Sequence, residues 1–374
     1  MANKALLLSS FNEPPKIVQQ PIPPATPGSV VVRILCTNII DYTQDVFNGK
    51  RGYSLSFPLI PGIGGIGRVH ATGPDSVNLS KGELVYVDGF IRARDYPDAS
   101  FLHGWTDTGS TGGKQLMDGE WRNGTFANFV KAPLENIFPL QEEKLMRFGY
   151  GHNDLCYILR LLVPFGGLGA ADVRAGDSVI VAPATGSFGG AAVECALALG
   201  ANVLAIGRHQ NKLDDMKRAM SKRGAERLQT LELSGEIGKD AEAAMAKSLG
   251  RKGFDTYIDF SPPAAAKSPH IQVCLMALKT GGKAVLMGGI TSDIMIPYPL
   301  LMSKNLQVQG RFMYERSDTE RLLSIVHSGL LPLGKRGGIE TVAEYKLDSW
   351  KQALEDASNK SAWGKQVVFK MNDN

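Results

Sequence analysis

A short turn rich in small residues is the stretch of this sequence best suited to hold a phosphate group. A glycine there lets backbone N–H groups approach an anion closely, and a following helix directs its partly positive N-terminus at the same point. Pro183 stands where the first glycine of the usual fingerprint lies, so the pattern is imperfect. The sequence predicts a pyrophosphate site, with an ordinary strand-to-helix turn as the alternative. The predicted contact residues are Thr185, Gly186, Ser187, Phe188 and Gly189.

The residues after the next apolar run indicate which dinucleotide is bound. Domains that bind NAD usually carry Asp or Glu at this point, where the carboxylate accepts from the ribose hydroxyls. This chain has Gly207 and Arg208 instead. Arg can bind a phosphate through two parallel hydrogen bonds, and Gly leaves room for it. The pattern therefore favours NADP(H), with His209 and Lys212 as further contacts. A solvated Arg208 at a helix start is the alternative.

Two buried strands and a helix are expected to position these groups. Ser178–Ala182 and Asn202–Ile206 are short apolar runs rich in β-branched residues, as in strands buried on both faces. Gly190–Leu199 lies between them, is rich in Ala and Leu, and favours a helix. Strand, glycine turn, helix and strand together form a βαβ unit. A later apolar run ends at two more predicted cofactor contacts, Gly288 and Gly289.

The rest of the chain falls into regions of different pattern. From about residue 155 to 303, strands alternate with helices, as in a doubly wound parallel sheet. Residues 1–140 instead contain short apolar runs separated by Pro and Gly turns, which suggests a barrel-like fold. Residues 304–374 have mixed character, with a helix near Asp318–His327 and a final strand at Gln366–Lys370. The fold class is therefore α/β.

Composition excludes several classes of function. A net charge of +4 on 374 residues is too small to indicate a nucleic-acid-binding protein. The four Cys have no paired spacing, which argues against a disulfide framework or a zinc ribbon and suits a reducing compartment. No apolar run is long enough to span a membrane, and the first residues lack the apolar core of a signal peptide. We expect a cytoplasmic protein that binds neither nucleic acid nor membrane.

Motifs along almost the whole chain resemble those of the medium-chain dehydrogenase/reductase superfamily, in its zinc-free branch similar to quinone oxidoreductases and enoyl reductases. The resemblance implies a Rossmann domain (158–303) that interrupts a GroES-like, barrel-type substrate domain (1–157 together with 304–374). It also implies an active site in the cleft between the domains. The matching segments are Val31–Ile34, Pro61–Gly67, Gly124–Val130, Arg174–Asp177, the turn at Gly186, Gly281–Lys283 and Gly364–Lys365.

The sequence departs from the zinc-dependent members of that superfamily at the positions of the metal ligands. Those members carry Gly-His-Glu where this chain has Gly62-Ile63-Gly64, and a Cys where counting places Ile40. The segment 88–122, where some relatives hold a structural zinc on four Cys, contains no Cys. Cys36 and Cys156 lack ligand partners and are interpreted as core residues. A catalytic zinc needs at least three protein ligands, so we expect no metal.

Without a metal, another group must supply or polarise a proton during reduction. The resemblance places Tyr42 where zinc-dependent relatives have a proton-relay hydroxyl. A phenol, whose usual pKa is about 10, stays protonated at neutral pH and can donate to a developing oxyanion or enolate. The alternatives are that Tyr42 lines the substrate site or packs against the cofactor or the barrel, with water as the proton source.

Together these observations predict an NADPH-dependent, metal-independent oxidoreductase that acts on a small molecule. The hydride acceptor is expected to be an enone or enoyl compound, a quinone or, less favoured, a carbonyl compound. The segment 88–122, with His103 and Trp105, and the segment 290–302 are expected to shape the substrate pocket. A cyclase or lyase, or a regulatory binding protein, that keeps the nucleotide pocket is the alternative. A homodimer is expected, with a monomer as the alternative.

Overall fold

The computed structural model describes residues 2–220, 224–248, 250 and 252–371, and the chain divides into two compact units. The first unit contains Met1–Leu159, Leu333–Ser361 and Lys365–Asn374, and the second contains Arg160–Pro332 and Ala362–Gly364. The second unit thus continues beyond the expected limit at residue 303, because a further strand joins its sheet there. Among the described residues, no helix has both the length and the apolar character needed to cross a membrane.

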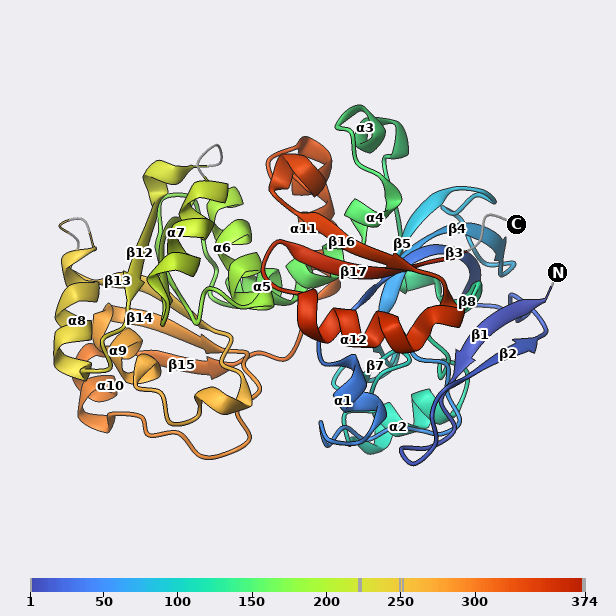
Figure 1. Ribbon diagram of the computed structural model, residues 1–374, viewed down its shortest axis with the longest axis horizontal. Coiled ribbons are helices and arrows are strands. Elements are labelled where there is room, and N and C mark those ends of the chain that lie inside the picture. The colour runs from blue at the N-terminus through green and yellow to red at the C-terminus, as the bar shows by residue number, and fades with distance from the viewer. Residues whose placement is uncertain (1, 221–223, 249, 251, 372–374) are drawn as a thin grey trace. The chain divides into compact units, whose positions relative to one another are not determined.

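The second unit is a doubly wound α/β fold. Its six strands are all parallel and lie in the order β12-β11-β10-β13-β14-β15, which is the Rossmann order (Figure 1). The strands are β10 (Ser178–Ala182), β11 (Asn202–Gly207), β12 (Leu228–Glu232), β13 (Phe254–Asp259), β14 (Leu278–Leu286) and β15 (Gln307–Gly310). The helices are α5 (Ile158–Ala170), α6 (Ser187–Ala198), α7 (Gln210–Ala219), α8 (Ile237–Ala246), α9 (His270–Ala277), α10 (Tyr298–Lys304) and α11 (Arg316–Ser328).

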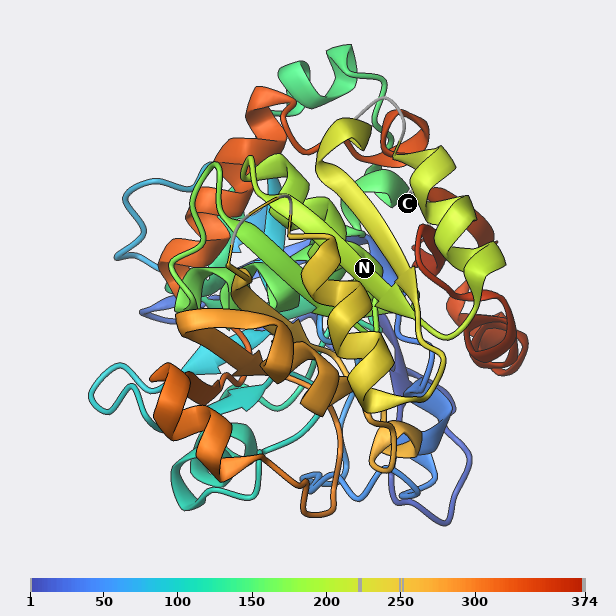
Figure 2. The same ribbon diagram turned by 90° about the vertical axis from the view of Figure 1, so that its left-hand side faces the viewer.

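Helices cover both faces of this sheet, which explains why almost every residue of the central strands is buried. Every residue of β10 is buried. Alternate side chains such as Ile180 and Leu204 pack into one core cluster with residues of α8 and α9. Helices α6 and α7 contact β10, β11 and β12, and Figure 2 shows α7 and α8 on opposite sides of the sheet. The predicted βαβ unit is confirmed, with its helix starting at Ser187 rather than Gly190.

The first unit is built on a mainly antiparallel sheet. Its strand order is β16-β17-β3-β4-β5-β9, with β8 paired to β3. The chain end predicted as a strand is β17, which pairs with β3 near the other end of the sequence. The strands are β1 (Asn3–Leu7), β2 (Lys16–Gln20), β3 (Ser29–Ile39), β4 (Gly64–Thr72), β5 (Leu84–Asp88), β8 (Phe129–Pro133), β9 (Ile137–Pro139), β16 (Glu340–Tyr345) and β17 (Lys365–Lys370). The helices are α1 (Thr43–Phe47), α3 (Glu142–Arg147), α4 (His152–Leu155) and α12 (Trp350–Lys360).

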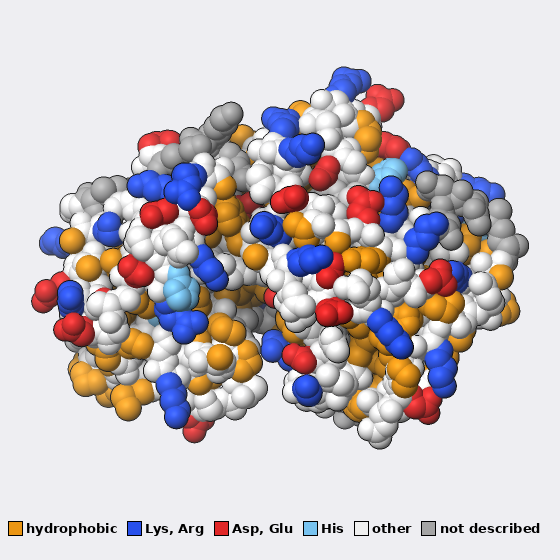
Figure 3. Space-filling model, viewed as in Figure 1, with side chains coloured by type: hydrophobic (Ala, Val, Ile, Leu, Met, Phe, Trp, Pro, Cys, Tyr) orange, Lys and Arg blue, Asp and Glu red, His pale blue; other side chains and the backbone are white. Residues whose placement is uncertain are grey.

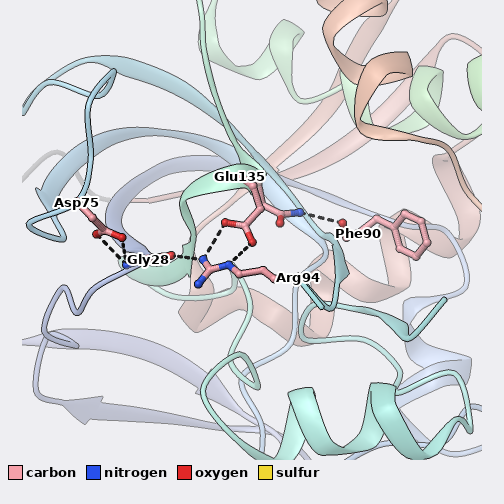
Figure 4. Close-up of polar contacts among 6 residues, drawn as sticks. Gly28, Asp75, Phe90, Arg94 and Glu135 are labelled. Carbon is pink, nitrogen blue, oxygen red and sulfur yellow. Dashed lines mark hydrogen bonds and ion pairs between the residues drawn. The ribbon is translucent and has the colours of Figure 1, made fainter. Parts of the chain in front are cut away.

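The segment 88–122, which is expected to shape the substrate pocket, contains regular structure of its own. It forms the hairpin of β6 (Phe90–Arg92) and β7 (Ser100–Leu102), followed by α2 (Thr111–Asp118). Arg94 ties the hairpin to the rest of the first unit, because its guanidinium forms two hydrogen bonds of 2.7 and 2.8 Å with the carboxylate of Glu135 and one of 2.6 Å with the carbonyl of Gly28 (Figure 4). Asn136 binds the carbonyl of Phe90 at 2.8 Å. The segment is therefore a braced part of the first unit.

Candidate functional site

The predicted phosphate turn lies between the end of β10 and the start of α6. Gly186 is the N-cap of α6, with extended backbone angles (φ −80°, ψ 173°), and no side chain caps the helix. The first N–H of α6 that finds an intrahelical acceptor is that of Gly190, which donates to the Gly186 carbonyl at 2.9 Å. The preceding N–H groups are left to bind a ligand or water. Gly186 is exposed, and a Cβ added to it would meet nothing within 4 Å.

Gly189 serves this turn in a different way from Gly186. A Cβ at Gly189 would lie 2.0 Å from the carbonyl oxygen of Pro183, an impossible contact with backbone. Glycine is therefore required there so that α6 can start directly after the turn. Sequence reasoning assigned both glycines to the close approach of a pyrophosphate. The structure gives Gly189 a packing role and leaves Gly186 as the glycine beside open space.

The turn lies at the point where the strand order of the sheet reverses. Strands β10 and β13 are neighbours, and the chain leaves them toward opposite edges of the sheet. Ligands of such sheets bind in the crevice outside the carboxyl ends of these two strands. Phe188, in the first turn of α6, stacks against Phe260, which follows β13, with ring centres 6.4 Å apart and planes at 22°. Both rings are half-buried.

The glycine pair after β14 holds a neighbouring turn in place. A Cβ at Gly288 would lie 2.6 Å from both the Asp259 carboxylate and the carbonyl of Ser261. The N–H of Gly289 donates to the same carbonyl at 2.7 Å. These glycines therefore fix the end of β14 against the turn that follows β13, next to the crevice.

That turn is supported by a buried polar network which sequence reasoning missed. Asp259 accepts hydrogen bonds from the Tyr257 hydroxyl at 2.9 Å and from Ser261 Oγ. Ser261 Oγ also lies 2.7 Å from Nε2 of His270, whose Nδ1 faces Ser268 Oγ at 2.8 Å. In a Ser-His-Asp triad the carboxylate binds the histidine nitrogen that does not face the serine. Here Asp259 instead binds the Oγ of Ser261, on the Nε2 side of His270, so the network is not such a triad. Burial raises the pKa of Tyr257, so its phenol remains a donor. The network positions the turn.

Exposed basic residues follow β11, where the sequence predicts the 2′-phosphate of NADP. Arg208, His209 and Lys212 are all exposed. In Figure 3, basic side chains and a histidine lie over the region of α7, with acidic side chains among them. A Cβ at Gly207 would lie 3.3 Å from side-chain atoms of Leu213 and Thr185, a tight contact with flexible neighbours. Because Arg208, His209 and Lys212 are exposed, their side chains are accessible to a phosphate group.

An acid from the next strand also approaches this position. Glu232, at the end of β12, is paired in register with Gly207 at the end of β11. Its Oε1 accepts a hydrogen bond of 3.1 Å from the backbone N–H of Gln210, the first residue of α7. Sequence spacing gave no signal for this contact, because 22 residues separate the two partners.

Tyr42 belongs to the first unit, where it immediately precedes α1. It is half-buried, its ring lies edge-on to Trp105 with centres 6.2 Å apart, and the Arg51 guanidinium stands 4.1 Å from its ring centre. Burial, together with the neighbouring Tyr53, raises the pKa of the Tyr42 phenol above its usual value. The hydroxyl therefore stays protonated at neutral and moderately alkaline pH.

His103 and Trp105 belong to the core of the first unit. Their exposed fractions are 0% and 2%, so neither lies on an open surface. Burial lowers the pKa of His103 to about 4, and the imidazole is therefore neutral at physiological pH. Through Trp105, the braced segment 88–122 supports the ring of Tyr42.

The positions of the zinc ligands in relatives do not fit a metal in this chain. Ile40 and Ile63 are buried hydrophobic residues. Gly64 has a φ of +112°, and a Cβ there would lie 2.7 Å from the carbonyl oxygen of Val87. A longer ligand side chain at residue 64 is thus excluded by both backbone conformation and space. Within the described ranges, no three His, Cys, Asp or Glu side chains lie close enough to hold a metal ion.

Two cysteines that sequence spacing left unrelated meet in the core of the first unit. Cys156 donates to Cys36 Sγ at 2.9 Å, and Cys36 in turn donates to the carbonyl of His152 at 3.1 Å. Both thiols are buried and unbridged. Burial, followed by the hydrogen bond with Cys36, raises the pKa of Cys156 and keeps it a thiol.

Comparisons with known proteins agree with both units. The family model described as "Alcohol dehydrogenase GroES-like domain" matches residues 26–142, and the model described as "Zinc-binding dehydrogenase" matches residues 188–328. An alcohol dehydrogenase from Moraxella sp. (strain TAE123) is 25% identical over 332 residues, which cover 87% of this chain and 89% of that protein.

Solved structures with the same fold extend over nearly the whole chain. A thermostable alcohol dehydrogenase from Pyrobaculum aerophilum matches with a TM-score of 0.72 at 20% identity, covering 99% of this chain and 100% of that one. An alcohol dehydrogenase from Escherichia coli CFT073 in complex with NADH matches with a TM-score of 0.76 at 15% identity, covering 99% of each chain. The two units are therefore a GroES-like domain and a Rossmann domain.

Proposed function

Because the chain belongs to the medium-chain dehydrogenase/reductase superfamily and is an oxidoreductase of its alcohol dehydrogenase type, we propose that it reduces a small molecule with NADPH and without a metal. The observation that carries the cofactor proposal is the end of β11. It bears Gly207 and exposed Arg208, where a ribose-binding acid would select NAD. A guanidinium there can bind the 2′-phosphate through two hydrogen bonds.

The turn after β10 has the form that a dinucleotide requires. Unpaired N–H groups at the start of α6 are donors for the pyrophosphate, and the open space beside Gly186 admits it. When bound, the nicotinamide supplies the hydride. The chain's own part is to hold and orient the dinucleotide: Thr185 to Gly189 at the pyrophosphate, Gly207 to His209 and Lys212 at the adenosine end, and Gly288 and Gly289 beside the crevice.

The proton is proposed to come from Tyr42. Its raised pKa keeps the hydroxyl protonated, and the neighbouring Arg51 cation favours negative charge at the oxygen once the proton has left. The hydride acceptor that suits this proton donor is a carbon–carbon double bond conjugated to a carbonyl, or a quinone. Hydride addition to either yields an enolate or phenolate oxygen that a phenol can protonate without a Lewis acid.

No step is assigned to zinc, because the residues at the ligand positions do not fit it. One matching family model is described as zinc-binding, but Ile40, Ile63 and Gly64 offer no donor atom in their side chains. Zinc requires nitrogen, sulfur or oxygen ligands from at least three side chains at a catalytic site. Polarisation of the substrate must therefore come from hydrogen-bond donors of the protein.

An NADPH oxidation assay with metal-depleted protein tests this proposal. Enones, enoyl thioesters, quinones and aldehydes serve as acceptors, and NADH replaces NADPH in a parallel series. We expect oxidation of NADPH by at least one enone, enoyl or quinone acceptor, at a higher kcat/KM than with NADH. Binding of NADPH without turnover of any acceptor would instead favour a cyclase, a lyase or a regulatory binding protein.

A further inference from the structure

A buried arginine lies directly behind the phosphate turn. Arg160, near the start of α5, has an exposed fraction of 1%. Its Nη1 donates a hydrogen bond of 2.8 Å to Ser187 Oγ. Ser187 is the first residue of α6 and is itself only half-buried, so its hydroxyl connects a buried charge to the open side of the turn. We propose that Arg160 is a positioning residue for the pyrophosphate of the dinucleotide and acts through Ser187.

The direction of the hydrogen bond gives the first reason. A hydroxyl has one hydrogen to donate and two lone pairs that accept. When Ser187 Oγ accepts from Arg160, its own hydrogen is turned away from the guanidinium and is available to a phosphate oxygen. A guanidinium has no acceptor and stays charged, so this orientation is not reversed at any physiological pH.

Electrostatics gives the second reason. The start of α6 carries the partial positive charge of its unpaired N–H groups, and Gly186 adds no acceptor that would cap them. A buried guanidinium in contact with the first residue adds a full positive charge where water screens it little. Glu194, which is also buried, lies two turns further along α6, so Arg160 is the nearer charge at the start of the helix.

Arg160 could not be assigned to the phosphate turn from the sequence, because it lies far from the turn along the chain. Arg160 precedes Ser187 by 27 residues and lies in an otherwise apolar helix. A charged residue in such a stretch costs free energy unless it is paired and hydrogen-bonded. The hydrogen bond to Ser187 Oγ places this charge at the start of α6, where an anion would bind. The inference rests on the proposed cofactor.

Three ligands separate this role from a purely structural one. Adenosine 2′-monophosphate lacks the pyrophosphate, 2′-phospho-ADP-ribose has it but lacks nicotinamide, and NADPH has both. Dissociation constants are measured for each ligand with the full chain and with Arg160→Gln and Arg160→Lys. We expect Arg160→Gln to weaken binding of 2′-phospho-ADP-ribose and NADPH by about 10- to 150-fold, the range of a charged hydrogen bond. Binding of adenosine 2′-monophosphate should not change, and Arg160→Lys should recover part of the loss.

A second pair of variants guards against a general loss of folding in Arg160→Gln. Ser187→Ala removes the connecting hydroxyl, whereas Ser187→Thr keeps a hydroxyl that can accept from Arg160. Ser187→Ala should show the same ligand pattern as Arg160→Gln to a smaller extent, and Ser187→Thr should resemble the wild type. The melting temperature of the Ser187 variants serves as the control for folding.

Several outcomes would overturn the inference. Equal loss for all three ligands would make Arg160 a structural residue, and loss for NADPH alone would place its action at the nicotinamide. Unchanged binding of all three by both Arg160→Gln and Ser187→Ala would remove the role altogether. If the wild-type chain bound none of the three, the proposed function itself would fail, which is a different result from any of these.

Discussion

At the scale of single residues, the proposed preference for NADPH depends on Arg208. Its side chain is exposed, so its removal should not affect folding. A charged hydrogen bond contributes about 1.5–3 kcal/mol, which corresponds to roughly 10- to 150-fold in affinity. We expect Arg208→Ala to weaken NADPH by that factor and to leave NADH nearly unchanged. Titration of both cofactors checks this, with Lys217→Ala, on the helix α7 that follows Arg208, as the matched control.

Removal of the charge of Glu232 should change NADPH affinity in the opposite direction from removal of Arg208. Its carboxylate lies at the first N–H of α7, beside the proposed phosphate position. Glu232→Gln keeps an acceptor for Gln210 while it removes the negative charge. NADPH affinity should therefore rise in Glu232→Gln while it falls in Arg208→Ala. Equal losses of NADH and NADPH in Arg208→Ala would show that this arginine supports the fold and does not bind the phosphate.

Tyr42 is the residue on which the proton-transfer proposal depends. Tyr42→Phe keeps the ring against Trp105 and removes only the hydroxyl. Turnover should fall by ~10²–10⁴-fold, as is typical when a general acid is lost, with little change in NADPH affinity. Because burial raises the pKa of Tyr42, the protonated, active form should persist beyond pH ~10. Steady-state kinetics across pH test both points. A Phe variant with normal turnover would reduce Tyr42 to a packing residue.

At the scale of elements, substitution of the two glycines of the phosphate turn should have different effects: Gly189→Ala should lower folding stability, and Gly186→Ala should weaken NADPH binding. Gly189→Ala brings a Cβ to 2.0 Å from the Pro183 carbonyl, and such overpacking costs about 1–3 kcal/mol of folding free energy. Gly186→Ala places its Cβ in open space, so its stability should change by less than about 1 kcal/mol. NADPH binding should nevertheless weaken in Gly186→Ala, because the methyl group occupies the phosphate approach.

Denaturant unfolding and NADPH titration of the two glycine variants provide the measurement. If Gly186→Ala lost as much stability as Gly189→Ala, both glycines would serve the turn alone. If Gly186→Ala bound NADPH normally, the pyrophosphate would not lie where the open space is.

The sequence predicted those parts of the fold and site that depend on local pattern. The strand at Ser178–Ala182, the turn at Gly186 and the strand at Asn202–Ile206 are contiguous, so composition and spacing were enough to find them. The departure from the zinc-dependent motif at Ile63 and Gly64 is also contiguous, so the prediction that zinc is absent rests on sequence alone.

Contacts between distant segments were out of reach of sequence pattern. Cys36 and Cys156 are 120 residues apart, and the structure brings them to 2.9 Å. Glu232 approaches α7 only because β12 pairs with β11. The segment 88–122 lacks long periodic runs, so its hairpin and helix gave no signal. Its attachment through Arg94 depends on where the turn between β8 and β9 places Glu135.

At the scale of the whole molecule, the chain should work without a metal. The residues at the ligand positions of zinc-dependent relatives are Ile40, Ile63 and Gly64, which offer no metal ligand, and Gly64 has no space for a side chain. We expect the purified protein to carry no stoichiometric zinc and its activity to survive exhaustive chelation. Elemental analysis and assays before and after chelation provide the check. One zinc per chain, with activity that disappears on its removal and returns on its addition, would contradict this account.

The most direct test of the central claim is transfer of deuterium from NADPH deuterated at C4 of the nicotinamide. Chelated protein is incubated with each stereoisomer of the labelled cofactor and with the best acceptor from the oxidation assay. Mass spectrometry then locates the label in the product. We predict that one of the two stereoisomers gives one deuterium at the carbon that accepts hydride, the β-carbon in an enone or enoyl acceptor. Unlabelled product from both stereoisomers, or transfer that requires added zinc, would contradict the account.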